Sequence, residues 1–394
     1  MSLAITNASL LLGTELNYIE QGYIIIENGR IMNAATGNYR GSDKKLDAKG
    51  FLVIPGLINA HTHIADSIGK DIGASQRLDA RVHPVFGAKK KILQKSLPEH
   101  VKAFIRNSAL SMMKKGVVAF ADFREGGVGG IKLLKEAVES LPIKYVTLGR
   151  ADYYSSSPKH EPGLPPEAVE QAKQVLKQSD GLGISGANEN TDTALAQYSQ
   201  LAGKKLIAIH AAESKETVKF SKMHTGNSEV YRIMEHLKPD FIVHMTYATE
   251  NEMSLVAKSG TGIVICPRAN GILGTGMPKV GQMLRQNCLV AIGTDNVMLN
   301  SPDILREMDY TWKASRATEG DMIKAHEVLK MATVNAAQIL RLNTGCIEVG
   351  RAADLVFIDK MHIDLYPMHD PYAAIVHRLS QSSISAVMID GRFV

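Results

Sequence analysis

Short apolar runs alternate with helix-like stretches through the middle of the chain. The runs have the length of buried strands and lie at Leu57–Ala60, Val117–Phe123, Tyr145–Leu148, Gly183–Ser185, Leu206–Ile209, Phe241–Val243, Gly262–Ile265 and Val290–Ile292. Eight such strands separated by helices over about 290 residues predict an α/β fold of the (β/α)8 (TIM) barrel type. Its active site is expected at the carboxyl ends of the strands. A doubly wound open sheet is the competing interpretation.

Two stretches between these runs carry clear helix signals. Residues 98–115 place apolar or small side chains on one face at helical spacing, namely Val101, Phe104, Ile105, Ser108 and Met112. Residues 249–252, TENE, have the form of a capping box, and Gly260 is the expected end of that helix.

Both ends of the chain show strand patterns instead. Ala4–Leu12, Tyr23–Glu27, Leu355–Ile358 and Ile384–Ile389 are apolar-rich, and the turn residues of 28–30 (NGR) and 390–391 (DG) lie beside them. We therefore expect the termini to meet in one small β-sandwich domain. The predicted parts are residues 1–54 and 344–394 for this domain and 55–343 for the barrel.

Composition excludes several classes of protein. The 394 residues are 45% hydrophobic and 22% charged, with a formal net charge of +5, which is ordinary for a globular protein. The densest basic run, 89–91 (KKK), is predicted to be a solvated helix face, so no nucleic-acid partner is expected. No apolar run reaches the length of a membrane span, and no signal peptide is recognised. The three cysteines lack CxxC spacing, which favours reduced thiols in a cytoplasmic enzyme.

Histidines stand at several of the predicted strand ends. His61 and His63 follow the first strand, where a period of two puts both rings on one face. His210, His244 and Asp295 follow three later strands. Each residue alone is more often structural than catalytic. Together they converge on the mouth of one barrel, which indicates a metal site.

These residues lie in motifs that resemble those of the amidohydrolase superfamily, and within it the cytosine deaminase and chlorohydrolase-like group. Residues 55–63, PGLINAHTH, are similar to the PGxxxxHxH signature. Residues 210–213 (HAAE), 266–270 (CPRAN) and 293–295 (GTD) are similar to the HxxE, CPxxN and GTD elements, and 345–359 to the return into the small domain. The resemblance spans nearly the whole chain and implies a metal-dependent hydrolase.

Imidazoles and one carboxylate suit Zn²⁺, and Fe²⁺ is the alternative. Members with two metals often bridge them with a modified lysine at the end of strand four, and residues 181–188 contain no lysine. We therefore expect one divalent ion, bound by His61, His63, His210 and Asp295. The resemblance implies that His244 hydrogen-bonds the hydrolytic water or the substrate. In a two-metal site it is a ligand instead.

The catalytic residues are predicted to be Glu213, His244 and Asp295. Asp295 is placed to accept a proton from the attacking water. In the similar deaminases the glutamate of HxxE passes protons to a ring nitrogen and then to the departing ammonia. The alternative for Glu213 is a solvent-facing residue at the start of a helix.

Substrate contacts are harder to read. The segment 66–91 is a predicted lid or pocket wall, with Arg77, Arg81 and His83 as candidates. Arg150, Asp152, Asn188 and Arg268 lie near other strand ends. Residues 126–130, GGVGG, lack the spacing of a phosphate-binding motif and are predicted to be a flexible loop.

The leading interpretation is hydrolytic deamination of an aminated heterocycle, a purine, pyrimidine or related ring. Metal-activated water attacks the carbon that bears the amino group, and ammonia leaves. A cyclic amidase or a triazine-type chlorohydrolase would use the same metal site. A non-catalytic scaffold is disfavoured because all the predicted ligands are present. The expected partner is the small heterocyclic substrate, and a homodimer is a further expectation.

Overall fold

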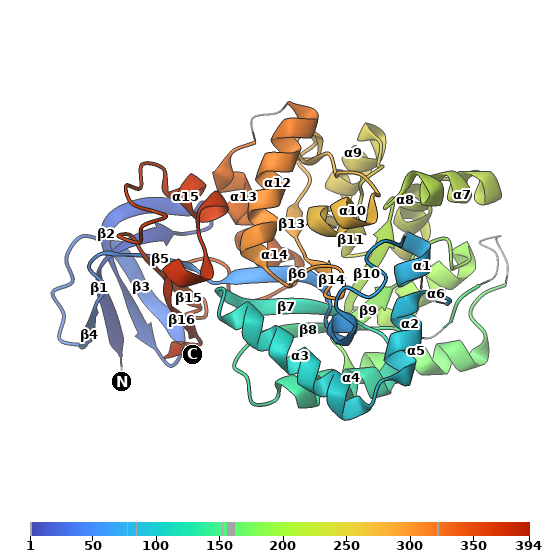
Figure 1. Ribbon diagram of the computed structural model, residues 1–394, viewed down its shortest axis with the longest axis horizontal. Coiled ribbons are helices and arrows are strands. Elements are labelled where there is room, and N and C mark those ends of the chain that lie inside the picture. The colour runs from blue at the N-terminus through green and yellow to red at the C-terminus, as the bar shows by residue number, and fades with distance from the viewer. Residues whose placement is uncertain (1, 77, 84, 152, 156–161, 321–322) are drawn as a thin grey trace.

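The computed structural model describes residues 2–76, 78–83, 85–151, 153–155, 162–320 and 323–394. Figure 1 shows a small β-rich part built from both ends of the chain, in blue and red, beside a larger part in which helices surround a second sheet. One buried apolar cluster lies within the small part, and a second, larger one runs from the parallel sheet onto the small sheet through residues such as Ile54 and Val356.

The small part is one mixed sheet with the strand order β17-β16-β15-β5-β1-β2-β3, and β4 pairs with β1. Its strands are β1 (Leu3–Leu12), β2 (Asn17–Glu27), β3 (Arg30–Thr36), β4 (Lys44–Asp47), β5 (Phe51–Pro55), β15 (Leu355–Asp359), β16 (Ile384–Ile389) and β17 (Arg392–Phe393). β5 pairs antiparallel with β15, and this ladder joins the two ends of the chain. The expectation that both termini build one small sheet domain is confirmed. Its packing as a two-layer sandwich and the boundaries at 54/55 and 343/344 stay predictions.

The larger sheet is parallel, in the order β13-β12-β11-β10-β9-β8-β7-β6-β14. Its strands are β6 (Leu57–His63), β7 (Val117–Arg124), β8 (Lys144–Gly149), β9 (Gly181–Ile184), β10 (Leu206–Ala211), β11 (Phe241–His244), β12 (Gly262–Ile265), β13 (Val290–Ile292) and β14 (Asp295–Asn296). All eight apolar runs of the sequence are therefore strands of this sheet.

The two ends of the parallel sheet are linked by the segment between β13 and β14. The Gly293 N–H donates to the Ile265 carbonyl at 2.9 Å, and the Thr294 N–H donates to the His61 carbonyl at 3.0 Å. β14 then pairs with β6. This segment therefore reaches from β12 on one side to β6 on the other, which is consistent with the predicted (β/α)8 barrel.

Helices follow most strands of the parallel sheet and cover it in Figure 1. They are α3 (Pro98–Met113), α4 (Gly127–Val138), α5 (Pro166–Gln178), α6 (Asp192–Ala202), α7 (Lys215–Thr225), α8 (Glu229–Arg232), α9 (Glu250–Ser259), α10 (Pro267–Leu273), α11 (Val280–Arg285), α12 (Ile304–Glu319), α13 (Ala325–Met331) and α14 (Val334–Ile339). The 3₁₀ turn η1 (Ile64–Gly69), α1 (Leu78–Val82) and α2 (Ala88–Lys95) follow β6, and α15 (Pro371–His377) lies between β15 and β16.

The helix predictions hold with one exception. Val101, Ile105 and Met112 of α3 are buried, but Phe104 is 37% exposed because its position lies at the rim of the packed face. Thr249 caps α9 in a reciprocal capping box with Glu252, and Gly260 ends the helix in the left-handed conformation, as predicted. Among the described residues, no helix has the length and apolar character needed to cross a bilayer.

Candidate metal centre and active site

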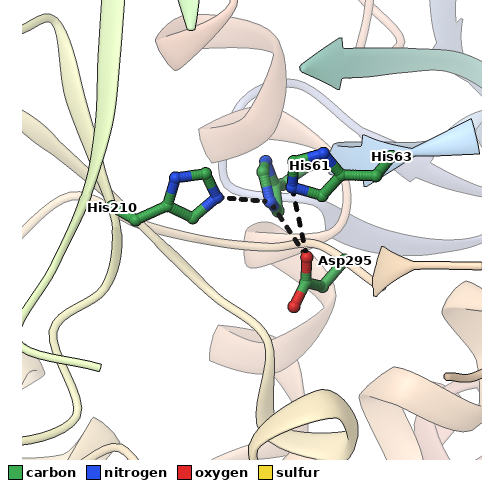
Figure 2. Close-up of side chains that lie close together, drawn as sticks. All are labelled: His61, His63, His210 and Asp295. Atoms are coloured by element: carbon green, nitrogen blue, oxygen red, sulfur yellow. Dashed lines mark hydrogen bonds and ion pairs between the residues drawn. The ribbon is translucent and has the colours of Figure 1, made fainter. Parts of the chain in front are cut away.

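Three histidines and one aspartate meet at the carboxyl ends of the parallel strands. His61 and His63 are alternate residues of β6, His210 lies near the end of β10, and Asp295 begins β14. Figure 2 shows the three rings turned toward the Asp295 carboxylate. One potential ligand atom from each of the four lies within 4.8 Å of the other three. The predicted quartet is therefore a single cluster.

The distances within the cluster are those of groups arranged around a common centre. Asp295 Oδ1 lies 3.3 Å from His61 Nε2 and 3.5 Å from His63 Nε2. His210 Nε2 lies 3.3 Å from His61 Nε2. These separations leave the ligand atoms facing one another (Figure 2).

The outer nitrogens of two rings decide which atoms face the centre with a lone pair. His63 Nδ1 lies 2.8 Å from the Glu125 carboxylate, and His210 Nδ1 lies 3.2 Å from the Ile184 carbonyl. A carboxylate and a carbonyl accept hydrogen bonds, so both Nδ1 atoms donate. Each Nε2 then presents a lone pair toward Asp295. A buried cluster of this kind can hold a cation, and its nitrogen and oxygen ligand atoms fit Zn²⁺ or Fe²⁺.

The protonation states agree with metal ligation. Burial lowers the pKa of His61 and His210 below the ordinary value and that of His63 to about 3, so the rings are neutral at pH 7. Burial opposes ionisation of Asp295, but its hydrogen bond and attraction to His61 hold the pKa of its carboxyl below the usual range. The cluster therefore offers neutral imidazoles and an ionised carboxylate at neutral pH.

Several site residues occupy strained backbone conformations. The φ angles of Ala212, His244 and Asp295 are 51°, 77° and 59°, in the left-handed region that costs non-glycine residues about 1–3 kcal/mol each. His244 ends β11, Ala212 directly follows β10, and Asp295 begins β14 three residues after the end of β13. Such strain is retained where the surrounding contacts impose it, and it is concentrated at functional sites.

Glu213 and His244 lie next to each other beside the cluster. His244 Nε2 is 3.7 Å from Glu213 Oε2. His244 Nδ1 is 3.1 Å from Asn270 Oδ1, and the Asn270 amide donates to Thr246 Oγ1. Because an amide oxygen only accepts, Nδ1 of His244 donates to Asn270, and Nε2 on the other side of the ring faces the Glu213 carboxylate. The sequence motif CPRAN contained Asn270, but its contact with His244 was not predicted.

A second group of charged residues, which the sequence analysis missed, supports His63. Glu125 directly follows β7 and accepts from the His63 ring, and Lys89 Nζ lies 2.5 Å from the same carboxylate oxygen. The prediction that residues 89–91 form a solvated face is wrong for Lys89, which is buried. Lys89 belongs to α2, and the ion pair with Glu125 compensates the cost of its burial. A strand-end position, as for His61 and His63, was the available signal for Glu125.

The candidate substrate residues divide into two groups. A cavity of about 120 Å³ is lined by the site residues His63, His210, Glu213, His244 and Asp295, and by His83 and Arg150 from the candidate set. Asn188 and Arg268 are not among its described lining residues. The Asn188 amide donates to the Thr217 carbonyl, and the Arg268 guanidinium to the Ser301 carbonyl. These contacts tie Asn188 to α7 and Arg268, a residue of α10, to the segment before α12, so we do not assign either side chain to the substrate. Arg77 and Asp152 lie outside the described residues.

The segment 66–91 and the glycine-rich run border a second cavity. This cavity, of about 530 Å³, shares Val82, His83, Lys89 and Arg150 with the smaller one. Gly126, Gly129 and Gly130 also line it. The glycine-rich run, predicted to be a flexible loop, instead continues into α4, whose first residue is Gly127.

The chain is similar to known proteins over its whole length. Residues 52–394 match the amidohydrolase family. The chain belongs to this family. It is 36% identical over 395 residues to a protein of Methanothermobacter thermautotrophicus named "Putative aminohydrolase", with 100% of this chain and 99% of that protein covered. It is 28% identical over 416 residues to a 5-methylthioadenosine/S-adenosylhomocysteine deaminase of Thermococcus sibiricus, covering 100% and 94%.

A solved structure gives the same placement. The chain superposes on an adenosine deaminase from Xanthomonas campestris with bound zinc at a TM-score of 0.85 and 21% identity, covering 99% of this chain and 92% of that one. At this identity the likeness shows the amidohydrolase fold. The family membership makes this protein an amidohydrolase-type hydrolase, and the cluster of His61, His63, His210 and Asp295 is its candidate site for one divalent metal.

Proposed function

We propose that this amidohydrolase is a metal-dependent aminohydrolase that releases ammonia from an aminated heterocycle, with Zn²⁺ preferred over Fe²⁺. The observation that carries the proposal is the position of Glu213. Its carboxylate faces His244 beside the metal cluster and lines the same cavity. The names of the similar deaminases support an aminated purine as the first substrate class to test.

The residues of the site can divide the work of deamination. A divalent ion held by the cluster would lower the pKa of a bound water molecule and would so supply a nucleophile at neutral pH. Asp295, whose pKa is held low, stays ionised and can accept the proton of the attacking water. His244, held through Nδ1 by Asn270, presents Nε2 to the cavity, where it can hydrogen-bond the same water and orient it.

Glu213 then moves protons on the substrate side. The ring nitrogen gains a proton as water adds to the neighbouring carbon, and the amine leaves as ammonia once it is protonated. Glu213 can give its proton to the ring nitrogen, take a proton from the added hydroxyl group and pass that proton to the amine. The proton that Asp295 accepted from the water then restores Glu213, and acid–base catalysis of this kind contributes about 10²–10⁴-fold in rate. Chloride leaves without protonation, so a chlorohydrolase would depend less on Glu213. A cyclic amidase of the two-metal type would need a bridging lysine at the end of the fourth strand, and residues 181–188 of this chain contain no lysine.

Replacement of Glu213 by glutamine tests this proposal. We expect Glu213→Gln to keep its metal and to hold KM within about tenfold, while kcat for the amino substrate falls by about 10²–10⁴-fold. Steady-state ammonia release across purines, pyrimidines, pterins and triazines identifies the substrate, and metal content is measured on the same samples. Glu216→Gln, an exposed position on α7, is the matched control and should behave as wild type. Retained metal with an unchanged kcat would show that Glu213 is only a helix-start residue.

A further inference from the structure

We propose that Glu125 is a positioning residue for the metal centre, holding His63 in the orientation and tautomer that bind the ion, and that Lys89 and Arg124 in turn fix Glu125. The inference rests on the metal site of the proposed function. It assigns a role to a group of buried charges that touches no substrate in the mechanism above.

The contact to His63 is direct. Glu125 Oε1 accepts a hydrogen bond from His63 Nδ1 at 2.8 Å, and His63 Nε2 on the other side of the ring lies 3.5 Å from Asp295 Oδ1. With the proton held on Nδ1, the ring can offer only Nε2 to a metal. A carboxylate in this position also makes the ligand nitrogen more basic, and its loss typically weakens metal affinity by about 10–100-fold.

Two cations restrict the Glu125 carboxylate to this geometry. Lys89 Nζ approaches Oε1 to 2.5 Å, and Arg124 Nη2 approaches Oε2 to 3.0 Å. The Lys89 and Arg124 side chains are 7% and 3% exposed, so solvent screens these pairs little. Arg124 Nη1 in turn lies 3.5 Å from Asp122 Oδ2, which forms a further ion pair with it. Both carboxylate oxygens are therefore engaged, and rotation of Glu125 away from His63 would break at least one buried ion pair.

His63 differs in this respect from the other two histidines of the cluster. His210 Nδ1 donates to a main-chain carbonyl, and His61 Nδ1 has no hydrogen-bond partner in the described part of the chain. Of the three, only His63 has a charged side chain behind it among the described residues. Because that partner is a side chain and not the main chain, it can be removed by substitution without rebuilding the backbone.

The test measures zinc affinity by competition with a chromophoric chelator at fixed pH. We expect Glu125→Ala to bind zinc about 10–100-fold more weakly than wild type. The double variant Glu125→Gln, Lys89→Met keeps an oxygen that accepts from His63 and leaves no new unpaired lysine, so its affinity should lie closer to wild type. Glu252→Gln is the control, because Glu252 is a buried carboxylate hydrogen-bonded to Ser228 and Thr249, and within the described part of the chain it makes no hydrogen bond or ion pair with the cluster.

Melting temperatures of the metal-free proteins separate positioning from simple destabilisation. A structural role alone would lower the melting temperature of Glu125→Ala and leave zinc affinity within twofold of wild type, which would overturn the proposal. A double variant no better than Glu125→Ala would do the same, as would a wild-type protein that binds no zinc. Ammonia release plays no part in this measurement. Failure of the deaminase assignment with zinc still bound is therefore distinguishable from failure of the role of Glu125.

Discussion

Gly293, between β13 and β14, is the position where the smallest substitution should do the most damage to the metal centre. A Cβ atom added there would lie 2.6 Å from the Cβ of His61, 2.7 Å from its backbone nitrogen and 3.0 Å from its Cα. Two of these three atoms are backbone, so no side-chain rotation relieves the contact. Gly293→Ala must therefore push β6 away from the segment that carries Asp295.

The size of that displacement can be worked out from the contacts. Ordinary contacts of a Cβ begin near 3.4 Å, about 0.8 Å beyond the 2.6 Å that Gly293→Ala would create. Metal–ligand distances are held to within about 0.2 Å. Half of the displacement of about 0.8 Å, taken up between His61 and Asp295, would already move one ligand atom beyond this tolerance for metal binding. Overpacking of this kind costs about 1–3 kcal/mol of folding free energy, which a barrel of this size should tolerate.

We expect Gly293→Ala to remain folded but to lose at least tenfold in zinc affinity, with ammonia release falling in parallel. Circular dichroism and thermal unfolding check the fold, chelator competition measures the zinc affinity, and a steady-state assay measures ammonia release. Gly129→Ala is the matched control, because a Cβ at Gly129 meets no atom within 4 Å. Zinc affinity and kcat within twofold of wild type in Gly293→Ala would refute the reasoning, since β6 would then have absorbed the methyl group without moving the ligands.

Two further predictions concern the residues behind the cluster. Asn270→Ala should lower the free energy of unfolding by about 2–5 kcal/mol, because His244 and the Thr246 hydroxyl lose a buried partner. It should also reduce kcat with little change in zinc content, and a kcat of Asn270→Ala unchanged from wild type would count against a role for the hydrogen bond to His244. Burial raises the pKa of Glu229 from its ordinary 4.5 to about 8, so the folded state holds a proton that the unfolded chain releases, and stability falls as pH rises from about 5 to 8. Glu229→Gln should flatten this fall by a few kcal/mol in denaturant titrations at pH 5 and 8, and equal slopes for both proteins would contradict the assignment.

The sequence predicted the parts of the molecule that follow from local periodicity. Each of the eight apolar runs is a strand of the parallel sheet because it is buried on both faces, which removes the polar alternation of an exposed strand. A residue at the carboxyl end of such a strand must lie at the mouth of the predicted barrel. That single rule brings His61, His63, His210 and Asp295 together from positions more than 230 residues apart.

The same rule did not extend to residues whose role depends on the packing of loops. Asn188 and Arg268 lie beyond strand ends, but their side chains donate to main-chain carbonyls and they are not among the described residues that line the smaller cavity. Lys89 has the sequence context of a surface residue, within three consecutive lysines, and becomes buried because α2 brings it against Glu125. A contact between a helix and the end of a strand elsewhere in the chain produces no periodic sequence pattern in either segment.

The strained strand ends explain why motif residues could be located while their geometry could not. A strand residue with ordinary dihedral angles alternates across the sheet, but the left-handed conformation at Asp295 turns the chain out of that alternation. The cost is met by contacts distant in sequence: Thr294 donates to both the His61 carbonyl and the Asn59 side chain, and Asn59 donates back to the Thr294 hydroxyl. Asn59 is fully buried, so these hydrogen bonds are protected from water. Contacts from β6 thus hold β14 in the conformation that carries the Asp295 carboxylate to the metal site. These contacts require the backbone of Gly293 to approach His61 closely, which a residue with a side chain would prevent.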